Sequence, residues 1–148
     1  MKKKLSFLLI IFSFLILNRI KAADEGDVLL HGVVSWNQDL KVVQGRYSVG
    51  YAFWNDFSLG ASYEHNGFFA APGAGITWHL EPFEIVTHAG PLFWEKKGVK
   101  KTYYHISLHA NYLTQITSHL QVILSAGVNL PGKRFRGVPL GAGLRYWF

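Results

Sequence analysis

The chain has 148 residues, of which 49% are hydrophobic and 16% charged, and it contains no Cys. This length bounds it to one domain, and the missing Cys excludes disulfides, thiolate metal sites and a lipoprotein anchor. The formal net charge is +6, but five of the 15 Lys and Arg residues lie within the first 21 positions. The rest of the chain has 10 basic and 9 acidic residues, a net charge of +1. The composition therefore gives no reason to expect a nucleic-acid partner.

The first 22 residues have the features of a secretory signal peptide. Three lysines, Lys2 to Lys4, precede an apolar run from Leu5 to Leu17, and a small residue, Ala22, follows. The run is shorter than the ~20 apolar residues that a transmembrane helix needs. We predict a cleaved signal peptide over residues 1–22 and a single mature domain over residues 23–148.

Eight segments of alternating apolar and polar residues follow the signal. Each has roughly the length of a tilted membrane-spanning strand, about 9–11 residues. No segment favours a helix. The pattern predicts an all-β fold, an eight-stranded antiparallel up-and-down transmembrane β-barrel. The expected strands are residues 28–36, 43–53, 57–64, 69–80, 83–94, 102–114, 119–130 and 138–148.

The two faces of these strands differ in chemistry. One face carries apolar and aromatic residues without a charge or a His. A soluble sandwich would have a charged exterior, whereas a Lys or Arg facing lipid costs about 2–4 kcal/mol at the bilayer midplane. We therefore expect the apolar face outside and the polar face in the lumen. The expected lumen residues include His31, Arg46, Glu64, His79, Glu84, His88, His105, His109, His119 and Arg145.

The lengths of the connections predict an orientation. Short turns are expected at Asn55–Asp56, Glu81–Pro82 and Thr117–Ser118, and longer connections at residues 37–42, 65–68, 95–101 and 131–137. In membrane barrels the short turns lie in the periplasm and the longer loops outside. Both termini are then periplasmic. Aromatic residues gather near the strand ends, as interfacial rings do: Phe53, Phe57, Trp78, Phe83, Tyr146 and Phe148 at the periplasmic end, and Trp36, Tyr63, Phe93 and Tyr104 at the outer end.

The last strand carries a second signal. Leu144, Tyr146 and the terminal Phe148 lie on its apolar face. This strand resembles the C-terminal strand of bacterial outer-membrane barrels, which the barrel-assembly machinery reads. The mature chain as a whole resembles small Gram-negative barrels of the OmpA-barrel, OmpX or NspA kind. The resemblance implies an outer-membrane location and a structural or surface-interaction role without a cofactor, and leaves the oligomeric state open.

One stretch suggests an alternative function. His105 and Ser107 match the His-x-Ser element of the lipid A 3-O-deacylases, barrels that use a Ser, a His and a Glu. In that family the acid follows the serine, whereas no Asp or Glu follows Glu95 here. The alternation also puts both residues in the lumen, away from lipid. Lipid A deacylation or acyl transfer is therefore the runner-up, and a narrow conductance pathway is third.

The histidines do not predict a metal site. His105 and His109 share a face but lie about 13 Å apart along a strand. Both cannot bind one zinc at roughly 2 Å. His79 and Glu84 form a closer pair across their hairpin. We expect these groups to make hydrogen bonds in a lumen filled by side chains, which also excludes a general porin.

Two expected outer loops are rich in cations. Such groups can contact the phosphates of lipopolysaccharide through charge-assisted hydrogen bonds. The sequence thus predicts lipopolysaccharide and outer-membrane lipid as partners. The residues are Lys96, Lys97, Lys100, Lys101, Lys133, Arg134 and Arg136.

The second and third strands predict an interior ion pair. Keeping the apolar faces together requires Phe53 opposite Phe57 and Tyr51 opposite Leu59. Arg46 then lies directly opposite Glu64 on the lumen face, because a slip by one residue would turn every side chain over. Opposed side chains lie about 4.5–5.5 Å apart at Cβ. We expect a bidentate contact between the two.

Deletion of Phe148 tests the terminal signal. We expect the shortened chain to reach the periplasm but to assemble slowly or not at all, because the recognition strand has lost its terminal aromatic residue. The compact, heat-modifiable band on an unboiled gel measures assembly. Assembly at the normal rate would contradict the interpretation.

Overall fold

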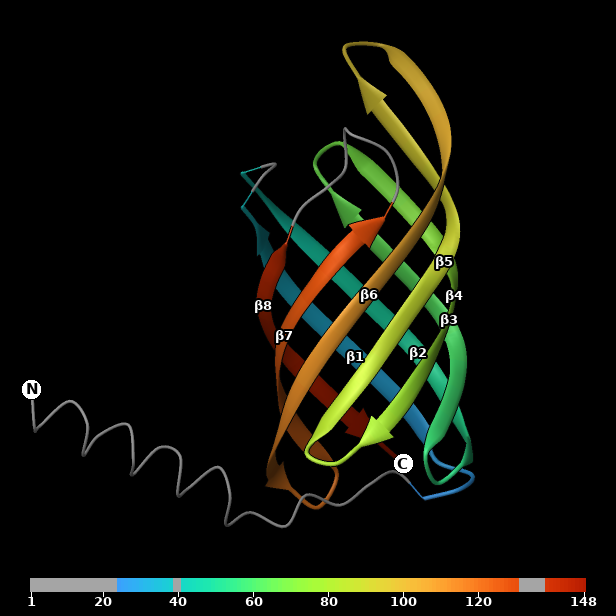
Figure 1. Ribbon diagram of the computed structural model, residues 1–148, viewed down its shortest axis with the longest axis vertical. Coiled ribbons are helices and arrows are strands. Elements are labelled where there is room, and N and C mark those ends of the chain that lie inside the picture. Colours follow the sequence, from blue (N-terminus) through green and yellow to red (C-terminus); the bar gives the residue numbers. More distant parts are fainter. Residues whose placement is uncertain (1–23, 39–40, 131–137) are drawn as a thin grey trace, which may run out of the picture.

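The computed structural model describes residues 24–38, 41–130 and 138–148, and it contains eight strands closed into a barrel (Figure 1). The predicted signal peptide lies outside these residues. All eight predicted strands are present, and their ends shift by a few residues. Within the described residues, no helix has the length and apolar character needed to cross a membrane. The strands are β1 (Val28–Asn37), β2 (Val42–Trp54), β3 (Phe57–Asn66), β4 (Phe69–Leu80), β5 (Phe83–Lys96), β6 (Val99–Thr117), β7 (Leu120–Leu130) and β8 (Pro139–Trp147).

Each strand pairs antiparallel with its sequence neighbours, and β8 closes the barrel against β1. The closing register puts Leu30 opposite Tyr146 and His31 opposite Arg145. Within the barrel wall, closure removes the free edges that an open sheet would have. The start of β1 and the C-terminus lie at the same end of the barrel as the short β2–β3, β4–β5 and β6–β7 turns (Figure 1). At the opposite end, the β5–β6 hairpin projects beyond the other connections.

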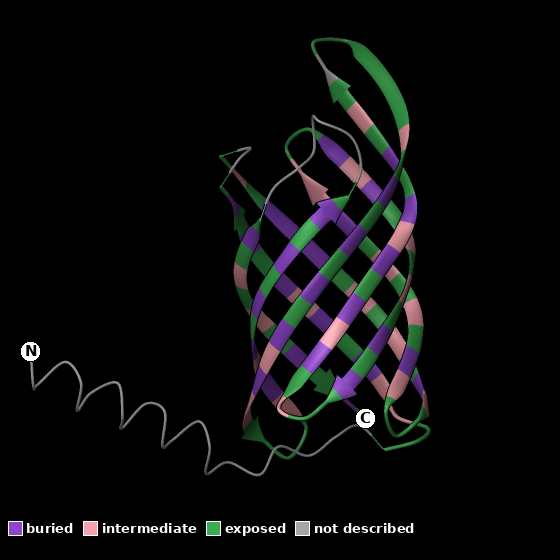
Figure 2. Cartoon of the chain, in the orientation of Figure 1, coloured by how far each residue is buried: buried purple, intermediate pink, exposed green. Residues whose placement is uncertain are grey.

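Burial alternates along most of the barrel wall, as the sequence predicts (Figure 2). The exceptions include Gln44 to Arg46 of β2, which are buried in succession, and residues 99–102 of β6, which are all exposed. Outer-wall residues such as Leu59 and Leu124 are more than half exposed. The ionisable residues predicted for the lumen are buried, with one exception. His119 is exposed because it lies in the β6–β7 turn, before β7 begins at Leu120, where its ring packs against Tyr146 and Trp147.

The register between β2 and β3 agrees with the prediction except beside the turn. Tyr51 opposes Leu59, and Arg46 opposes Glu64. The expected pairing of Phe53 with Phe57 is wrong, because the register shifts there and Trp54 opposes Phe57 instead. Such a bulge adds one residue to a strand and re-aims the side chains next to it.

The lumen also contains apolar clusters that the sequence analysis did not identify. Leu29, Ala52 and Trp147 pack together near the end that carries the termini. Phe69, Ala71 and Leu92 form another cluster near the β3–β4 turn, with Trp94 and Tyr103 packed against it. A third consists of Val33, Leu113 and Ile123. The first two clusters lie towards opposite ends of the barrel.

Leu124→Arg tests which wall faces lipid. Leu124 is 51% exposed near the middle of β7, so an arginine there should cost about 2–4 kcal/mol of stability in a bilayer. Ser118→Arg, in the exposed β6–β7 turn, is the matched control and should leave stability nearly unchanged. Urea unfolding in lipid vesicles measures both. Equal stability of the two variants would show that Leu124 does not contact lipid.

Candidate functional site

Two carboxylates, Glu64 on β3 and Glu84 on β5, organise the polar part of the lumen. Both are 0% exposed. A buried carboxylate is costly unless neighbouring donors replace the hydrogen bonds that water would make. The contacts of each carboxylate therefore decide how this lumen is held together.

Glu64 is contacted from two other strands. The Ser107 hydroxyl donates to its Oε1 at 2.6 Å, and Nε2 of His105 lies 2.8 Å from its Oε2. Nε2 of His109 lies 3.3 Å from Oε1, and the Gln44 amide donates to Oε2 at 3.3 Å. His105, Ser107 and His109 are alternate residues of β6. Glu64 thus joins β3 to β6 across the lumen.

Glu84 forms a second centre. The Asn111 amide donates to its Oε1 at 2.8 Å, and Arg145 Nη1 donates to its Oε2 at 3.1 Å. His31 and His79 approach it at 3.7 and 3.5 Å. The Arg145 guanidinium also lies 5.7 Å from the centroid of the Trp147 ring, within cation–π distance. This centre connects the polar network with the apolar cluster of Trp147.

Arg46 contributes to the second network. Its Nη2 donates to Asn111 Oδ1 at 3.2 Å and to Ser125 Oγ at 3.3 Å. The expected bidentate contact with Glu64 is not among the described contacts of either side chain, although the two residues oppose each other in the register. The physical reason is that lumen side chains point towards the barrel axis. Arg46 here meets its partners on the facing strands β6 and β7.

His105 and Ser107 do meet a glutamate, but not with the geometry of a catalytic triad. The acid is Glu64, which precedes the serine in the chain, the reverse of the order in the deacylases. In a triad the histidine lies between the acid and the nucleophile, whereas here both side chains contact the same carboxylate. His105 and Ser107 are also 0% exposed. The arrangement ties β6 to β3 without placing a histidine between Ser107 and the acid.

Amide side chains of the polar face, to which the sequence assigns no partners, also take part in these networks. Gln44 bonds to Glu64, Asn129 donates to Gln44 Oε1 at 3.3 Å, and Asn111 joins Arg46 to Glu84. Their place on the polar face was the available signal. No three His, Asp or Glu side chains in the described part of the chain are arranged to hold a metal ion.

At the other candidate site, the β5–β6 hairpin carries four of the predicted cations. Lys97, with a φ of 51°, lies at its tip. Glu95 opposes Lys100, and the Lys100 Nζ lies 3.7 Å from a carboxylate oxygen of Glu95. Lys101 opposes Trp94 on the other face of the hairpin, and Lys96 opposes Val99 in the backbone register. The remaining predicted cations, Lys133, Arg134 and Arg136, lie outside the described residues.

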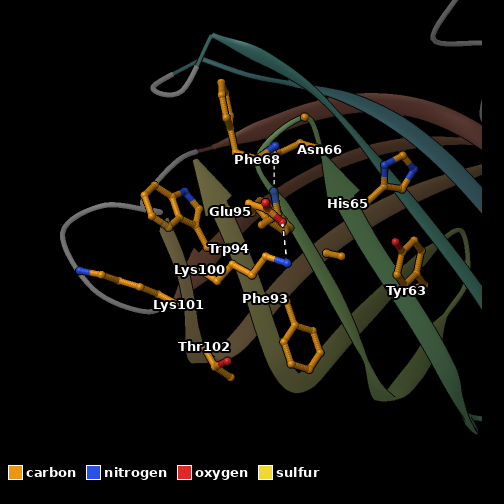
Figure 3. A pocket seen from close by; sticks show the side chains of 13 residues that line it. Tyr63, His65, Asn66, Phe68, Phe93, Trp94, Glu95, Lys100, Lys101 and Thr102 are labelled. Carbon is orange, nitrogen blue, oxygen red and sulfur yellow. Dashed lines mark hydrogen bonds and ion pairs between the residues drawn. The ribbon is translucent and has the colours of Figure 1, made fainter. Parts of the chain in front are cut away.

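A groove of about 720 Å³ lies between the β3–β4 turn and the base of this hairpin (Figure 3). We call it the hairpin groove; it is lined by residues 63, 65–70, 93–95 and 100–102. The Asn66 Oδ1 accepts hydrogen bonds from the backbone of Phe68 and Phe69 at 2.7 and 3.0 Å. The Glu95 N–H donates to the Phe68 carbonyl at 3.0 Å. These bonds fix the turn against the hairpin.

The proposed assembly signal lies on the closing strand. Leu144 and Tyr146 are exposed on the outer wall, and Phe148 follows β8. Phe148 and Val28 exchange two backbone hydrogen bonds of 2.9 and 3.2 Å. The terminal residue therefore takes part in closing the barrel.

A double-mutant cycle tests whether Ser107 works through Glu64. Ser107→Ala removes a hydrogen bond to a charged group and should cost about 1.5–3 kcal/mol. In a Glu64→Gln background the same change should cost clearly less, because the charged acceptor is already gone. The free energy of unfolding in urea measures the cycle.

Glu84→Gln serves as the matched control background, because the described contacts of Glu84 do not include Ser107. There the cost of Ser107→Ala should equal its cost in the original chain. Additivity in both backgrounds would contradict the Ser107–Glu64 contact.

Comparisons with known proteins agree on the fold. No family model matches the chain, and no curated protein matches it in sequence. Among solved structures, the N-terminal barrel domain of Pseudomonas aeruginosa OprF is 12% identical, with a TM-score of 0.70 over 85% of this chain and 100% of that one. Yersinia pestis Ail in a phospholipid nanodisc is 12% identical, with a TM-score of 0.58 over 84% and 100%. Neisserial surface protein A is 15% identical, with a TM-score of 0.54 over 82% and 95%. The chain thus has the fold of the small eight-stranded outer-membrane β-barrels.

Proposed function

We propose that this protein is a small integral barrel of the bacterial outer membrane, with a closed lumen and an outer end that binds lipopolysaccharide. The observation that carries the proposal is the division of side chains between the two walls. The outer wall is apolar, whereas Glu64, Glu84, Arg46 and Arg145 are buried inside. The outer wall of such a barrel is stable in contact with lipid, whereas in water it would expose a large apolar surface.

Closure of the lumen argues for a structural or interaction role over transport. Eight strands leave an interior that side chains just fill. Here that interior combines the two carboxylate networks with apolar clusters towards both ends. General diffusion would require much of this packing to open. Acyl transfer has less support, because Ser107 and His105 are buried around one carboxylate.

The orientation follows from the rule that short turns face the periplasm. The termini and the three short turns then lie on the periplasmic side of the membrane, and the β5–β6 hairpin projects from its outer surface. The barrel-assembly machinery would read Leu144, Tyr146 and Phe148, and the predicted signal peptide would direct export. At the outer end, Lys97, Lys100 and Lys101 would meet the phosphates of lipopolysaccharide.

A triple variant tests this partner. Replacing Lys97, Lys100 and Lys101 with Gln should weaken lipopolysaccharide binding about a hundredfold at low ionic strength, because each cation near an anionic surface is worth about 1 kcal/mol. Binding of purified protein to lipopolysaccharide-containing vesicles measures the change. The difference from the original chain should shrink in high salt. Equal binding at every ionic strength would refute lipopolysaccharide recognition by the hairpin.

A further inference from the structure

We infer that the hairpin groove is a specific site for a phosphorylated lipid A headgroup, with Lys100 as its phosphate-binding residue. The inference rests on the proposed function and assigns that function to one site. The groove combines an exposed cation with an apolar lower wall. This combination matches a lipid that carries an anionic head above its acyl chains.

Lys100 lies on the face of the hairpin that continues the outer wall. Phe93 and Thr102 oppose each other, and the next pair on that face is Glu95 and Lys100. Lys101 is on the other face, opposite Trp94. Figure 3 shows Lys100 extending across the groove, while Lys101, which also lines the groove, points away from Lys100. Lys100 is therefore the lysine that extends across the groove from the face that continues the outer wall.

The height of Lys100 suits a lipid phosphate. Phe93 is 50% exposed and, with Tyr63, belongs to the predicted outer aromatic girdle. Lys100 lies two residues beyond the level of Phe93, which is about 7 Å along a strand and about 5 Å along the axis of a barrel with strands tilted by roughly 40°. The headgroup region adds roughly 5–7 Å to each side of the hydrocarbon core. The ammonium group thus lies at the depth of the headgroups.

The walls of the groove suit the remainder of the lipid. Phe93, Tyr63 and Ala70 line its lower part and belong to the apolar outer wall, so acyl chains can lie against them. The turn at Asn66 to Phe69 is held by its own hydrogen bonds and by Glu95. The volume of about 720 Å³ is within the range of small-molecule sites.

Glu95 acts as the intramolecular competitor for Lys100. Their side chains are 60% and 78% exposed, and their ion pair spans 3.7 Å. An exposed pair of this kind contributes little to stability, so a phosphate, which carries more charge and more acceptor oxygens, can displace the carboxylate. Removing the carboxylate should therefore strengthen phosphate binding, an effect opposite to the removal of Lys100.

Three single variants in phosphatidylcholine nanodiscs test the site. The probe is bisphosphorylated lipid A, with dephosphorylated lipid A as the second ligand, and native mass spectrometry measures the bound lipid. Lys100→Gln should weaken binding of bisphosphorylated lipid A about fivefold. Glu95→Gln should strengthen it measurably. Lys41→Gln, which removes an exposed lysine from the β1–β2 connection at the same end of the barrel, should leave it unchanged. Dephosphorylated lipid A should bind weakly to all variants.

The outcomes separate this inference from the proposed function. Equal losses in Lys100→Gln and Lys41→Gln would overturn the site while leaving general attraction to lipopolysaccharide intact. Equal binding of both lipids would overturn the role of the phosphate. If the original chain bound neither lipid, the proposed lipopolysaccharide partner and this site would both be wrong. A heat-modifiability gel establishes that each variant has folded.

Discussion

The requirement that every backbone group find a partner within the chain determines the rest of this structure. A bilayer core offers no hydrogen bonds, so a sheet that crosses it must close on itself. The pairing of β8 with β1, completed by the bonds between Phe148 and Val28, meets this requirement. Closure with eight strands then divides the side chains by alternation into an outer wall and a narrow lumen. The chemistry of both walls follows from this division.

The narrow lumen makes buried polar groups dependent on one another. Glu64 and Glu84 cannot be solvated there, and each is contacted by side chains from facing strands. Some partners come from neighbouring strands, Gln44 for Glu64 and Asn111 for Glu84. Others come from across the lumen, Ser107 for Glu64 and Arg145 for Glu84, so the networks connect opposite sides of the barrel. Asn111 contacts both Arg46 and Glu84, which ties an arginine of β2 to a carboxylate of β5. Stability inside the barrel is therefore shared among the strands.

The sequence predicts those features that depend on the two-residue period and on the cost of charge in lipid. The strands and the pairing of Arg46 with Glu64 in the register follow from them. The hairpin pair of His79 and Glu84 also follows. The partners across the lumen do not follow, because such a contact depends on side-chain length and on which strands face each other once the barrel has closed. The same limit applies to Ser107, which meets a glutamate of another strand. The bulge beside Trp54 likewise depends on local turn geometry, which cannot be predicted from the alternation of apolar and polar residues.

The two ends of the barrel differ for a related reason. Turns at one end are short, whereas β5 and β6 continue their pairing beyond the barrel to Lys96 and Val99. Beyond the apolar wall a charged side chain no longer carries the free-energy cost of contact with lipid. The strand face that is apolar within the wall can therefore carry a cation there. Lys100 occupies this position, with Glu95 as its counterion when no other anion is bound. The same alternation that excludes charge from the membrane wall thus places a cation just above it.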